Sequence, residues 1–323
     1  MAELDQLFSR AREWGEASLA IATVIRTWGS APRPIGSHML VHDDGRFEGS
    51  VSGGCVENDV IAEARMVARN GGLRRLLFGV EDASAWHAGL PCGGDIEILI
   101  QQVGERGFAP GWFGCIAKAR EKGEIFRLAT DLDTGLTGKA VGPGDFINHY
   151  RPRRRLLIVG AVQIAQILCR FAEELDFEVT IIDPRQAYLD RSRFPSGHLN
   201  DRWPDDAIRA AKPNSSTAVV TLSHDPKLDD PALLAALASP AGYIAALGST
   251  RSHHARLERL EALGVTGEAL DRIEGPAGVP LGGRSVSEIA LSIAAGAVRA
   301  LSEAVPEHRD SSPVAAVHHH VFV

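Results

Sequence analysis

Two of the chain's four cysteines stand beside a pair of glycines, in turns whose residue types suit ligand binding. The first is Cys55, in the stretch EGSVSGGCVEND over residues 48–59, where a strand-like segment passes into a helix-like one. Gly53 and Gly54 have no Cβ to hold a ligand off the backbone, and N–H groups at a helix N-terminus attract anions. The helix dipole also favours the thiolate form of a cysteine placed there. This combination predicts a cradle for a phosphate-bearing ligand that also contains sulfur or a metal.

Serine hydroxyls and a second thiol extend this predicted cradle. Ser50 and Ser52 can donate hydrogen bonds to phosphate oxygens from the same turn. Cys92, followed by Gly93 in LPCGGDIEIL, precedes a strand-like run, and we expect both cysteine turns to reach one pocket. A pair of thiols holds soft metals and sulfur-bearing ligands, so Cys55 and Cys92 are candidate metal contacts. A helix cap with a buried cysteine is the structural alternative at Cys55.

Two further loops have the composition of anion-binding sites. Arg33 lies between two prolines in TWGSAPRPIGSHM, a stiff loop whose guanidinium suits a phosphate or a pterin edge. A purely structural bend is the alternative there. Gly248, Ser249 and Arg251 follow the buried strand-like run YIAAL and begin a helix-like segment, which directs backbone N–H groups toward an anion.

The segment LLIVGAVQIAQILCRFAEELDFEVTIIDPR predicts a βαβ unit whose turn resembles a dinucleotide-binding fingerprint. Gly160 takes the first glycine position and Ala165 the last, and Asp183 ends the next strand, where an acidic residue often meets a ribose hydroxyl. The middle glycine is replaced by Val162, whose branched Cβ stands where a pyrophosphate would approach. Gly160 and Asp183 are therefore candidate cofactor contacts, but we do not expect ordinary NAD(P) binding.

Two predicted α/β units position these loops. Hydrophobic patterning predicts a mixed α/β domain over 1–105 with at least four strands, then the end of that domain and a connection over 106–150. Alternating strand-like and helix-like segments over 151–305 predict a doubly wound, Rossmann-like parallel sheet. Its last helix is expected to begin at the capping-box sequence SVSE, and residues 306–323 are expected to form a flexible tail.

Composition limits the classes of partner. The net charge of −7, from 34 basic and 41 acidic side chains, argues against broad binding to nucleic acid or to an anionic membrane. No apolar run reaches the roughly 18 residues of a membrane span, and the charged N-terminus has no signal-peptide core. We therefore expect a cytoplasmic protein with reduced thiols. Cys115 and Cys169 lie in apolar, helix-like segments and are predicted to be small core residues.

Six of these segments together resemble the XdhC/CoxI family, the accessory proteins of xanthine dehydrogenase and related molybdenum hydroxylases. They are GSAPRPIGSHM, GSVSGGCVE, CGGDIEIL, LLIVGAVQIAQ, ALGSTRSHHARLERL and PLGGRSVSEIALSI, in the family's order. The resemblance implies a homodimeric chaperone that binds molybdenum cofactor and protects it while a cysteine desulfurase installs the terminal sulfur ligand. Such a protein then delivers the cofactor to the apo-hydroxylase. Cys55 and Cys92 match cysteine positions of the family's motifs.

Three functional hypotheses are open at this point. The first is the molybdenum-cofactor chaperone, without turnover of its own, because the sequence contains no catalytic triad and no general-base histidine in a motif. The second is an NAD(P)-dependent oxidoreductase that uses the βαβ domain. The third is an interaction scaffold that brings desulfurase and hydroxylase together without touching the cofactor.

Overall fold

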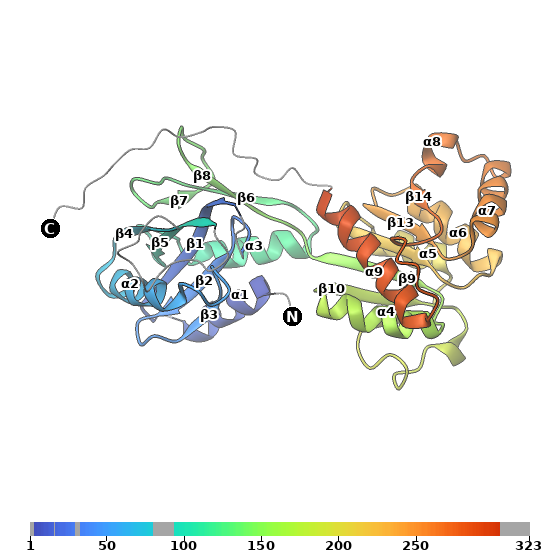
Figure 1. The fold of residues 1–323 in the computed structure, drawn as a ribbon, viewed down its shortest axis with the longest axis horizontal. Coiled ribbons are helices and arrows are strands. Elements are labelled where there is room, and N and C mark those ends of the chain that lie inside the picture. The colour runs from blue at the N-terminus through green and yellow to red at the C-terminus, as the bar shows by residue number, and fades with distance from the viewer. Residues whose placement is uncertain (1–2, 16, 30–32, 80–93, 304–323) are drawn as a thin grey trace.

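The chain folds into two α/β domains that lie end to end along its longest dimension (Figure 1). The computed structural model describes residues 3–15, 17–29, 33–79 and 94–303. Cys92 and Gly93, together with the expected tail over 306–323, lie outside these ranges.

An antiparallel sheet forms the centre of the N-terminal domain (Figure 1). Within the described ranges its strands are, in spatial order, β3 (Phe47–Gly49), β2 (His38–His42), β1 (Leu19–Trp28), β5 (Asp95–Gln102) and β4 (Leu73–Phe78). Side chains of β1 alternate between two buried clusters, with Ala20 and Ala22 in one cluster and Leu19 and Ile21 in the other. This alternation is the period of a strand that is covered on both faces.

Different elements cover the two faces of this sheet. On one face, α2 (Glu57–Asn70) buries Val60, Ala64 and Val67 against the strands. The other face packs against α1 (Glu3–Trp14), α3 (Gly111–Glu121) and a small sheet of β7 (Thr137–Gly138), β6 (Phe126–Thr130) and β8 (Phe146–Tyr150). The segment 106–150, expected to be the end of the domain plus a connection, thus contributes one helix and three strands to this packing.

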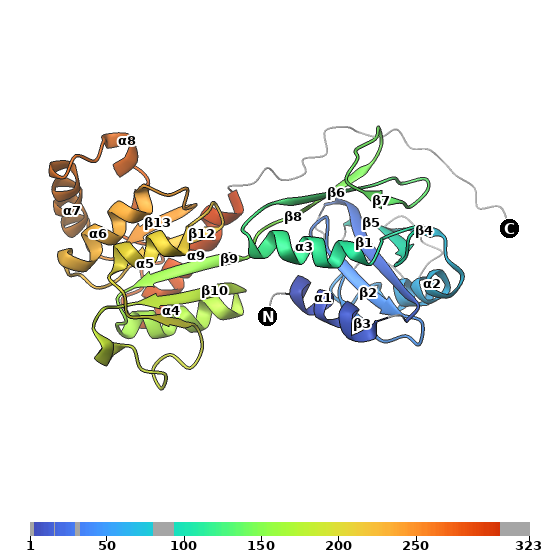
Figure 2. The ribbon, with the colours of Figure 1, turned by 180° about the vertical axis from the view of Figure 1, so that it is seen from behind.

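Six parallel strands in the described residues form the sheet of the C-terminal domain, and helices cover both of its faces (Figures 1 and 2). In spatial order the strands are β11 (His198–Asn200), β10 (Phe177–Ile182), β9 (Arg154–Val159), β12 (Thr217–Thr221), β13 (Tyr243–Ala246) and β14 (Ile273–Glu274). One face carries α4 (Gln163–Glu174) and α9 (Val286–Glu303). The opposite face carries α5 (Pro204–Ala211), α6 (Pro226–Leu237), α7 (Thr250–Ala262) and α8 (Gly267–Leu270), and a 3₁₀ turn spans Gln186–Tyr188.

The central strand β9 shows why this sheet is visible in the sequence. Leu156 and Ile158 enter the cluster beneath α4 and α9, whereas Leu157 and Val159 enter the cluster beneath α5 to α8. A strand buried on both faces is a continuous apolar run. The predicted α/β class, with a mixed domain followed by a doubly wound Rossmann-like domain, is confirmed.

The last helix begins where the capping box predicts. The Ser285 backbone N–H donates to the Glu288 carboxylate at 2.9 Å, and the Glu288 N–H reaches the Ser285 hydroxyl at 3.3 Å. These reciprocal bonds satisfy two N–H groups that an α-helix leaves without intrahelical partners.

The junction between the domains is held by charged side chains of the N-terminal domain. Residues 151–153 connect β8 to β9, and the Asp5 carboxylate of α1 lies 2.9 Å from Arg153 Nε and 3.6 Å from Arg120 Nε. Arg120 also donates through Nη1 to the Arg151 carbonyl at 2.7 Å. One buried carboxylate thus ties the connection to α1 and α3.

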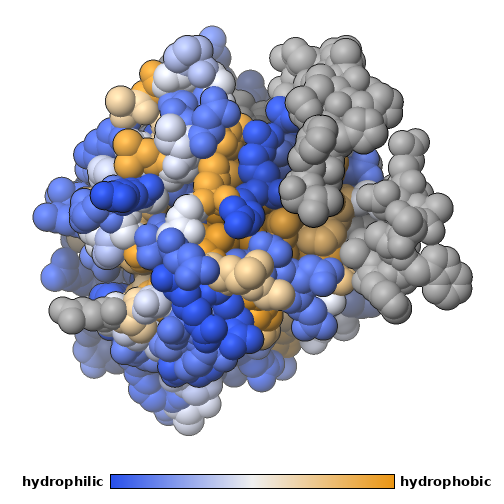
Figure 3. Space-filling model, turned by 90° about the vertical axis from the view of Figure 1, so that its left-hand side faces the viewer, coloured by the Kyte–Doolittle hydropathy of each residue, from blue (hydrophilic) through white to orange (hydrophobic). Residues whose placement is uncertain are grey.

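The outer end of the N-terminal domain carries a band of hydrophobic side chains between hydrophilic ones (Figure 3). Exposed apolar side chains of this domain include Leu77 of β4, Met66 of α2 and Leu136 beside β7. Across the described residues, no helix combines the length and apolar character needed to cross a membrane.

Candidate functional site

Strand register brings three of the predicted ligand loops to one end of the N-terminal sheet. The last residue of β1, Trp28, pairs with the first residue of β5, Asp95, and Phe78 at the end of β4 pairs with Ile96. At the other edge, the end of β3 pairs with the start of β2. The turn with Cys55, the loop with Arg33 and both ends of the segment that contains Cys92 therefore open at the same end of the sheet. Cys92 and Gly93 themselves lie outside the described residues.

The turn before α2 is already occupied by a carboxylate of the same chain. Glu57 Oε1 accepts from the Ser52 backbone N–H at 2.9 Å and from the Ser50 hydroxyl at 2.6 Å. Glu57 Oε2 accepts from the Gly54 N–H at 2.8 Å and from the Ser52 hydroxyl. The Val51 N–H lies 3.3 Å from Oε1. The Ser50 and Ser52 hydroxyls and the Gly54 N–H, which the sequence predicts as phosphate donors, therefore bind Glu57.

Hydrogen bonding also sets the charge state of this turn. Burial alone would raise the pKa of Glu57, but hydrogen bonds from Ser50 and Ser52 hold that pKa at about 2, below the ordinary 4.5. The remaining turn N–H groups are directed inward as well, because the Gly53 N–H donates to the Ser50 hydroxyl at 2.9 Å and the Cys55 N–H to the Ser52 hydroxyl at 3.0 Å. The turn is thus ordered by hydrogen bonds within the chain, and the Glu57 carboxylate takes the place of a bound anion.

The rigid turn leaves one reactive group outside. Cys55 is exposed, in contrast to the buried cysteine of the structural alternative. Because its backbone N–H is bonded to Ser52 and the helix begins two residues later, the backbone that carries the thiol has a defined position at the loop end of the sheet. The chemistry that this turn offers a ligand is therefore a presented thiol.

The predicted cation of the neighbouring loop is paired within the chain. Arg33 donates to both carboxylate oxygens of Glu3, at 3.0 Å through Nη1 and 2.6 Å through Nη2. This bidentate pair joins the loop to the start of α1. The sequence predicts a guanidinium presented to a phosphate or a pterin edge, whereas the structure gives Arg33 an intramolecular carboxylate partner.

The fingerprint turn of the C-terminal domain is also satisfied internally. Asp183 is fully buried, and its carboxylate accepts from the Ala161 N–H at 2.8 Å and from Arg185 Nε and Nη2 at 2.8 and 2.7 Å. Burial would raise the pKa of Asp183, but the Arg185 hydrogen bonds lower it. A Cβ on Gly160 would lie 2.9 Å from the Ser223 nitrogen, so close packing explains this glycine. A ribose would reach Asp183 only by displacing Arg185.

The second predicted turn of that domain is a regular helix cap. Ser249 is the N-cap of α7, and its hydroxyl accepts from the Ser252 N–H at 3.2 Å. Gly248 precedes it after β13, and Arg251 is exposed in the first turn of the helix. Because β9 enters the sheet from the junction between the domains, the carboxyl edge that carries Gly160 and Gly248 faces away from the N-terminal domain (Figures 1 and 2). The candidate residues therefore form two groups within one chain.

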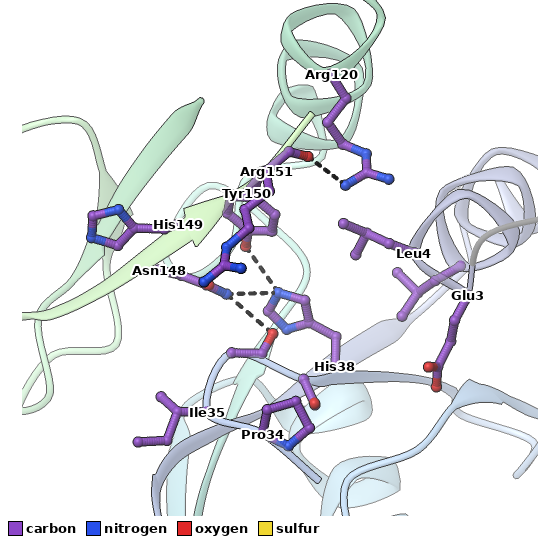
Figure 4. Close-up of a pocket in the computed structure, with 13 residues that line it drawn as sticks. Glu3, Leu4, Pro34, Ile35, His38, Arg120, Asn148, His149, Tyr150 and Arg151 are labelled. Atoms are coloured by element: carbon purple, nitrogen blue, oxygen red, sulfur yellow. Dashed lines mark hydrogen bonds between the residues drawn. The ribbon is translucent and has the colours of Figure 1, made fainter. Parts of the chain in front are cut away.

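A buried hydrogen-bond network that the sequence did not predict lies beside the Arg33 loop (Figure 4). The His38 ring contacts Thr23 Oγ1 at 2.9 Å through Nδ1, and Tyr150 Oη at 2.9 Å and Asn148 Nδ2 at 3.0 Å through Nε2. Burial lowers the pKa of His38 to about 4, so this histidine is neutral at pH 7. In the sequence, the trace that this network leaves near His38 is the glycine at position 36, because a Cβ there would lie 2.6 Å from Asn148 Oδ1.

The network forms one wall of a cavity of about 240 Å³. Its other walls come from the start of α1, from residues 34–37, and from Arg120 and Arg151 at the junction (Figure 4). The cavity therefore belongs to the N-terminal domain and opens beside the connection to the C-terminal domain.

Thiols and metal-ligating side chains are dispersed elsewhere in the described part of the chain. Cys169 is buried, as predicted, but Cys115 is exposed, so its assignment to the core was wrong. Its helix α3 packs through Phe113, Ile116 and Ala119, which leaves Cys115 on the outer face. No group of three or more His, Cys, Asp or Glu side chains among the described residues has the arrangement of a metal site.

Comparison with protein families gives two matches that follow the domain order. The model of the XdhC and CoxI family matches residues 15–79, and the model of the XdhC Rossmann domain matches residues 156–296. The first range contains the Cys55 turn, and the second contains the turns at Gly160 and Gly248.

Comparison with individual proteins gives relatives that align with this chain over most of their length. The molybdenum cofactor insertion chaperone PaoD of Escherichia coli is 30% identical over 286 residues, which cover 85% of this chain and 81% of the relative. A Bacillus subtilis protein described as a probable subunit of xanthine dehydrogenase is 25% identical and is covered over 91% of its length. The crystal structure of a Bacillus halodurans protein described as a xanthine dehydrogenase superposes with a TM-score of 0.76 over 97% of this chain and 98% of its own, at 23% identity. That likeness concerns the fold.

Proposed function

The chain belongs to the XdhC and CoxI family, and from this membership we propose that it binds molybdenum cofactor as cargo and inserts it into a xanthine dehydrogenase-type molybdenum hydroxylase. In this role it protects the cofactor while a cysteine desulfurase supplies the terminal sulfur ligand. The protein has no turnover of its own. The name of the Escherichia coli relative supports the first part of this proposal.

The exposed Cys55 thiol on its rigid turn is the observation that carries the proposal. The Glu57 carboxylate fixes the turn through the backbone N–H groups of Ser52 and Gly54, so the backbone that carries the exposed thiol is in place before any ligand arrives. A soft sulfur ligand suits a metal bound by sulfur. Thus Cys55 contacts the metal or its sulfur ligands, and Cys92, whose segment begins and ends at the same end of the sheet, remains its predicted partner.

Cofactor retention tests the thiol role directly. The protein is isolated from cells with an active molybdenum pathway, and bound molybdenum and pterin are measured by metal analysis and mass spectrometry. Wild-type protein is expected to carry about one cofactor per chain, and Cys55→Ala to lose most of it. Cys115→Ala is the matched control, because Cys115 is also an exposed thiol but lies on α3. Equal retention by the two variants would remove Cys55 from the site.

Delivery requires a separate experiment. Apo-hydroxylase is mixed with cofactor-loaded protein, and the recovered hydroxylase activity is compared with that obtained from free cofactor. Faster recovery with loaded protein supports insertion. Activation by a protein preparation that never carries cofactor would support the scaffold hypothesis instead.

Binding of a nicotinamide dinucleotide is not expected at the fingerprint turn, since Arg185 occupies Asp183. Titration with NADH checks this point, and micromolar binding that Asp183→Ala abolishes would favour an oxidoreductase.

A homodimer is also part of the proposal, because a two-fold arrangement could bring the two groups of candidate residues together. Sedimentation that shows only monomer at micromolar concentration would exclude it.

A further inference from the structure

The cavity beside His38 has a cation on its inner wall that the chain does not fully compensate. Arg120 is 9% exposed, and its Nε lies in the interior without a hydrogen-bond partner in the described structure. The nearest carboxylate oxygen, from Asp5, is 3.6 Å away, and the same carboxylate also serves Arg153 at 2.9 Å. Asp5 thus compensates the Arg120 charge only in part, and a buried charge that is incompletely paired is costly unless something supplies a further contact.

A second guanidinium lines the cavity nearer the domain junction. Arg151 contributes its backbone carbonyl to Arg120, but its own guanidinium has no hydrogen bond or ion pair within the described residues. Figure 4 shows the Arg151 side chain extending from the junction toward the side of the cavity that carries the His38 network. Two arginines, one inner and one outer, therefore line a single cavity.

The remaining charges around the cavity do not cancel these arginines. Glu3 lines the opposite wall, but both of its oxygens are bound by Arg33. The charged residues that line the cavity, taken together with their ion-pair partners, comprise four arginines and two carboxylates, which leaves an excess of two positive charges. The arginines are Arg33, Arg120, Arg151 and Arg153, and the carboxylates are Glu3 and Asp5. Asp176 and Arg154 also lie close enough to interact electrostatically with these arginines, but their opposite charges leave the excess unchanged.

The neutral groups of the cavity favour an anion that also carries an organic part. His38, Asn148 and Tyr150 offer uncharged polar contacts, and Leu4 and Ile35 offer apolar ones. Pockets for drug-sized ligands measure about 300–1,000 Å³, so a cavity of about 240 Å³ fits one end of such a ligand. A phosphate monoester carries close to two negative charges at neutral pH.

We propose that this cavity binds the phosphate monoester end of an organic ligand, with Arg120 and Arg151 as its cationic contacts. The turn before α2 cannot serve that group while Glu57 occupies its N–H donors. The terminal phosphate of molybdenum cofactor is the ester that the proposed function supplies, and this identification alone rests on that function. A free phosphate ester or inorganic phosphate has the same chemistry.

Binding of two simple probes tests the cavity without any cofactor. Inorganic phosphate and ethyl phosphate are titrated into the full-length protein at fixed ionic strength by calorimetry and ³¹P NMR. Wild-type protein is expected to bind ethyl phosphate, and Arg151→Gln to weaken binding about tenfold or more, because a charge-assisted contact is lost. Arg106→Gln, at an exposed arginine of the same domain, is expected to leave it unchanged. No binding to wild type, or equal binding to both variants, would overturn the proposal.

Arg120→Gln is a second variant, measured after circular dichroism has established that it is folded, because it removes a partner of the buried Asp5. Its expected loss of ethyl phosphate binding is at least as large as that of Arg151→Gln. The ligand's identity is settled by cofactor retention. Arg151→Gln protein that loses both ethyl phosphate and cofactor identifies the ester as the cofactor's phosphate. Cofactor retention by Arg151→Gln equal to that of the wild type would overturn that identification. If the wild-type protein binds ethyl phosphate through these arginines but never holds cofactor, the cavity proposal is supported and the proposed function is contradicted.

Discussion

The Glu57 carboxylate lies 2.9 Å from the Ser52 backbone nitrogen, inside the turn where the sequence predicts a phosphate. The same carboxylate accepts from the Gly54 N–H at 2.8 Å. Glu57 is therefore an internal counterpart of the predicted anion, and it binds the donors that glycine-rich turns before helices usually offer to ligands. The consequence is a preformed turn that presents Cys55 without help from a ligand.

Removal of the Glu57 charge is expected to destabilise the N-terminal domain. Glu57→Gln keeps the shape but loses a charged acceptor for several donors, and hydrogen bonds to charged groups are worth about 1.5–3 kcal/mol each. We expect the free energy of unfolding to fall by about 1–3 kcal/mol, measured by urea denaturation.

Glu63→Gln is the matched control on the same helix. Glu63 forms an ion pair with Arg74 at 3.6 Å between partly exposed side chains, and such surface pairs contribute about 0–1 kcal/mol. A Glu57→Gln protein no less stable than Glu63→Gln would show that the carboxylate does not hold the turn.

The fold was predictable because its signals are local. The run LLIVG is apolar throughout and TAVVTL is mostly β-branched, as is typical of strands covered on both faces, and the capping box at Ser285 is confined to four residues. Strand order in the N-terminal sheet was not predictable, since β1 pairs with β5 across more than 60 intervening residues and no short turn connects them.

The site was less predictable because its decisive contacts join residues distant in the sequence. Arg33 has the composition of a ligand contact, and only the fold reveals Glu3 as its partner, 30 positions away. His38 and Tyr150 are separated by 112 positions. Glu57 is close to Ser52, but whether its side chain turns back into the loop or out to solvent depends on geometry that residue type does not specify.

The pKa of His38 is expected to be about 4, well below the ordinary 6.5, because burial disfavours its charged form. Above pH 6.5 the ring is neutral in both the folded and the unfolded chain, but between pH 6.5 and 4 only the unfolded chain binds the proton, so the free energy of unfolding falls as the pH falls through this window. The fall amounts to about 3 kcal/mol, and His38→Gln should lose this pH dependence. Ring-proton NMR titration and urea denaturation at several pH values measure both quantities. An NMR midpoint near 6.5 would mean that the ring is hydrated.

Gly36 is expected to tolerate no side chain. It has φ of +88°, and a Cβ there would lie 2.6 Å from Asn148 Oδ1. Gly36→Ala therefore combines backbone strain with a steric clash and should cost roughly 2–4 kcal/mol. Gly72→Ala, at φ of +92° with open space around the Cβ, carries the strain alone and should cost roughly 1 kcal/mol.

The clash at Gly36 has its own test in a double-mutant cycle. Asn148→Ala removes the obstructing oxygen, so Gly36→Ala should cost less in that background than in the wild type. Additive losses in the two variants would indicate that the Asn148 side chain moves aside freely.

The described cysteines are expected to differ sharply in reactivity toward alkylating reagents. Cys55 and Cys115 are exposed, whereas Cys169 is buried and its pKa is raised to about 12 by burial and by the nearby Glu173. Because the thiolate is the reactive form, brief treatment with iodoacetamide at pH 8 should modify the first two and spare Cys169. Peptide mass spectrometry distinguishes the three sites, and labelling in urea provides the reference in which all three react alike. Rapid modification of Cys169 in the native protein would contradict this prediction. It would require α4 to move away from the loop after β10, and the helix would then be far more mobile than its packing against the sheet implies.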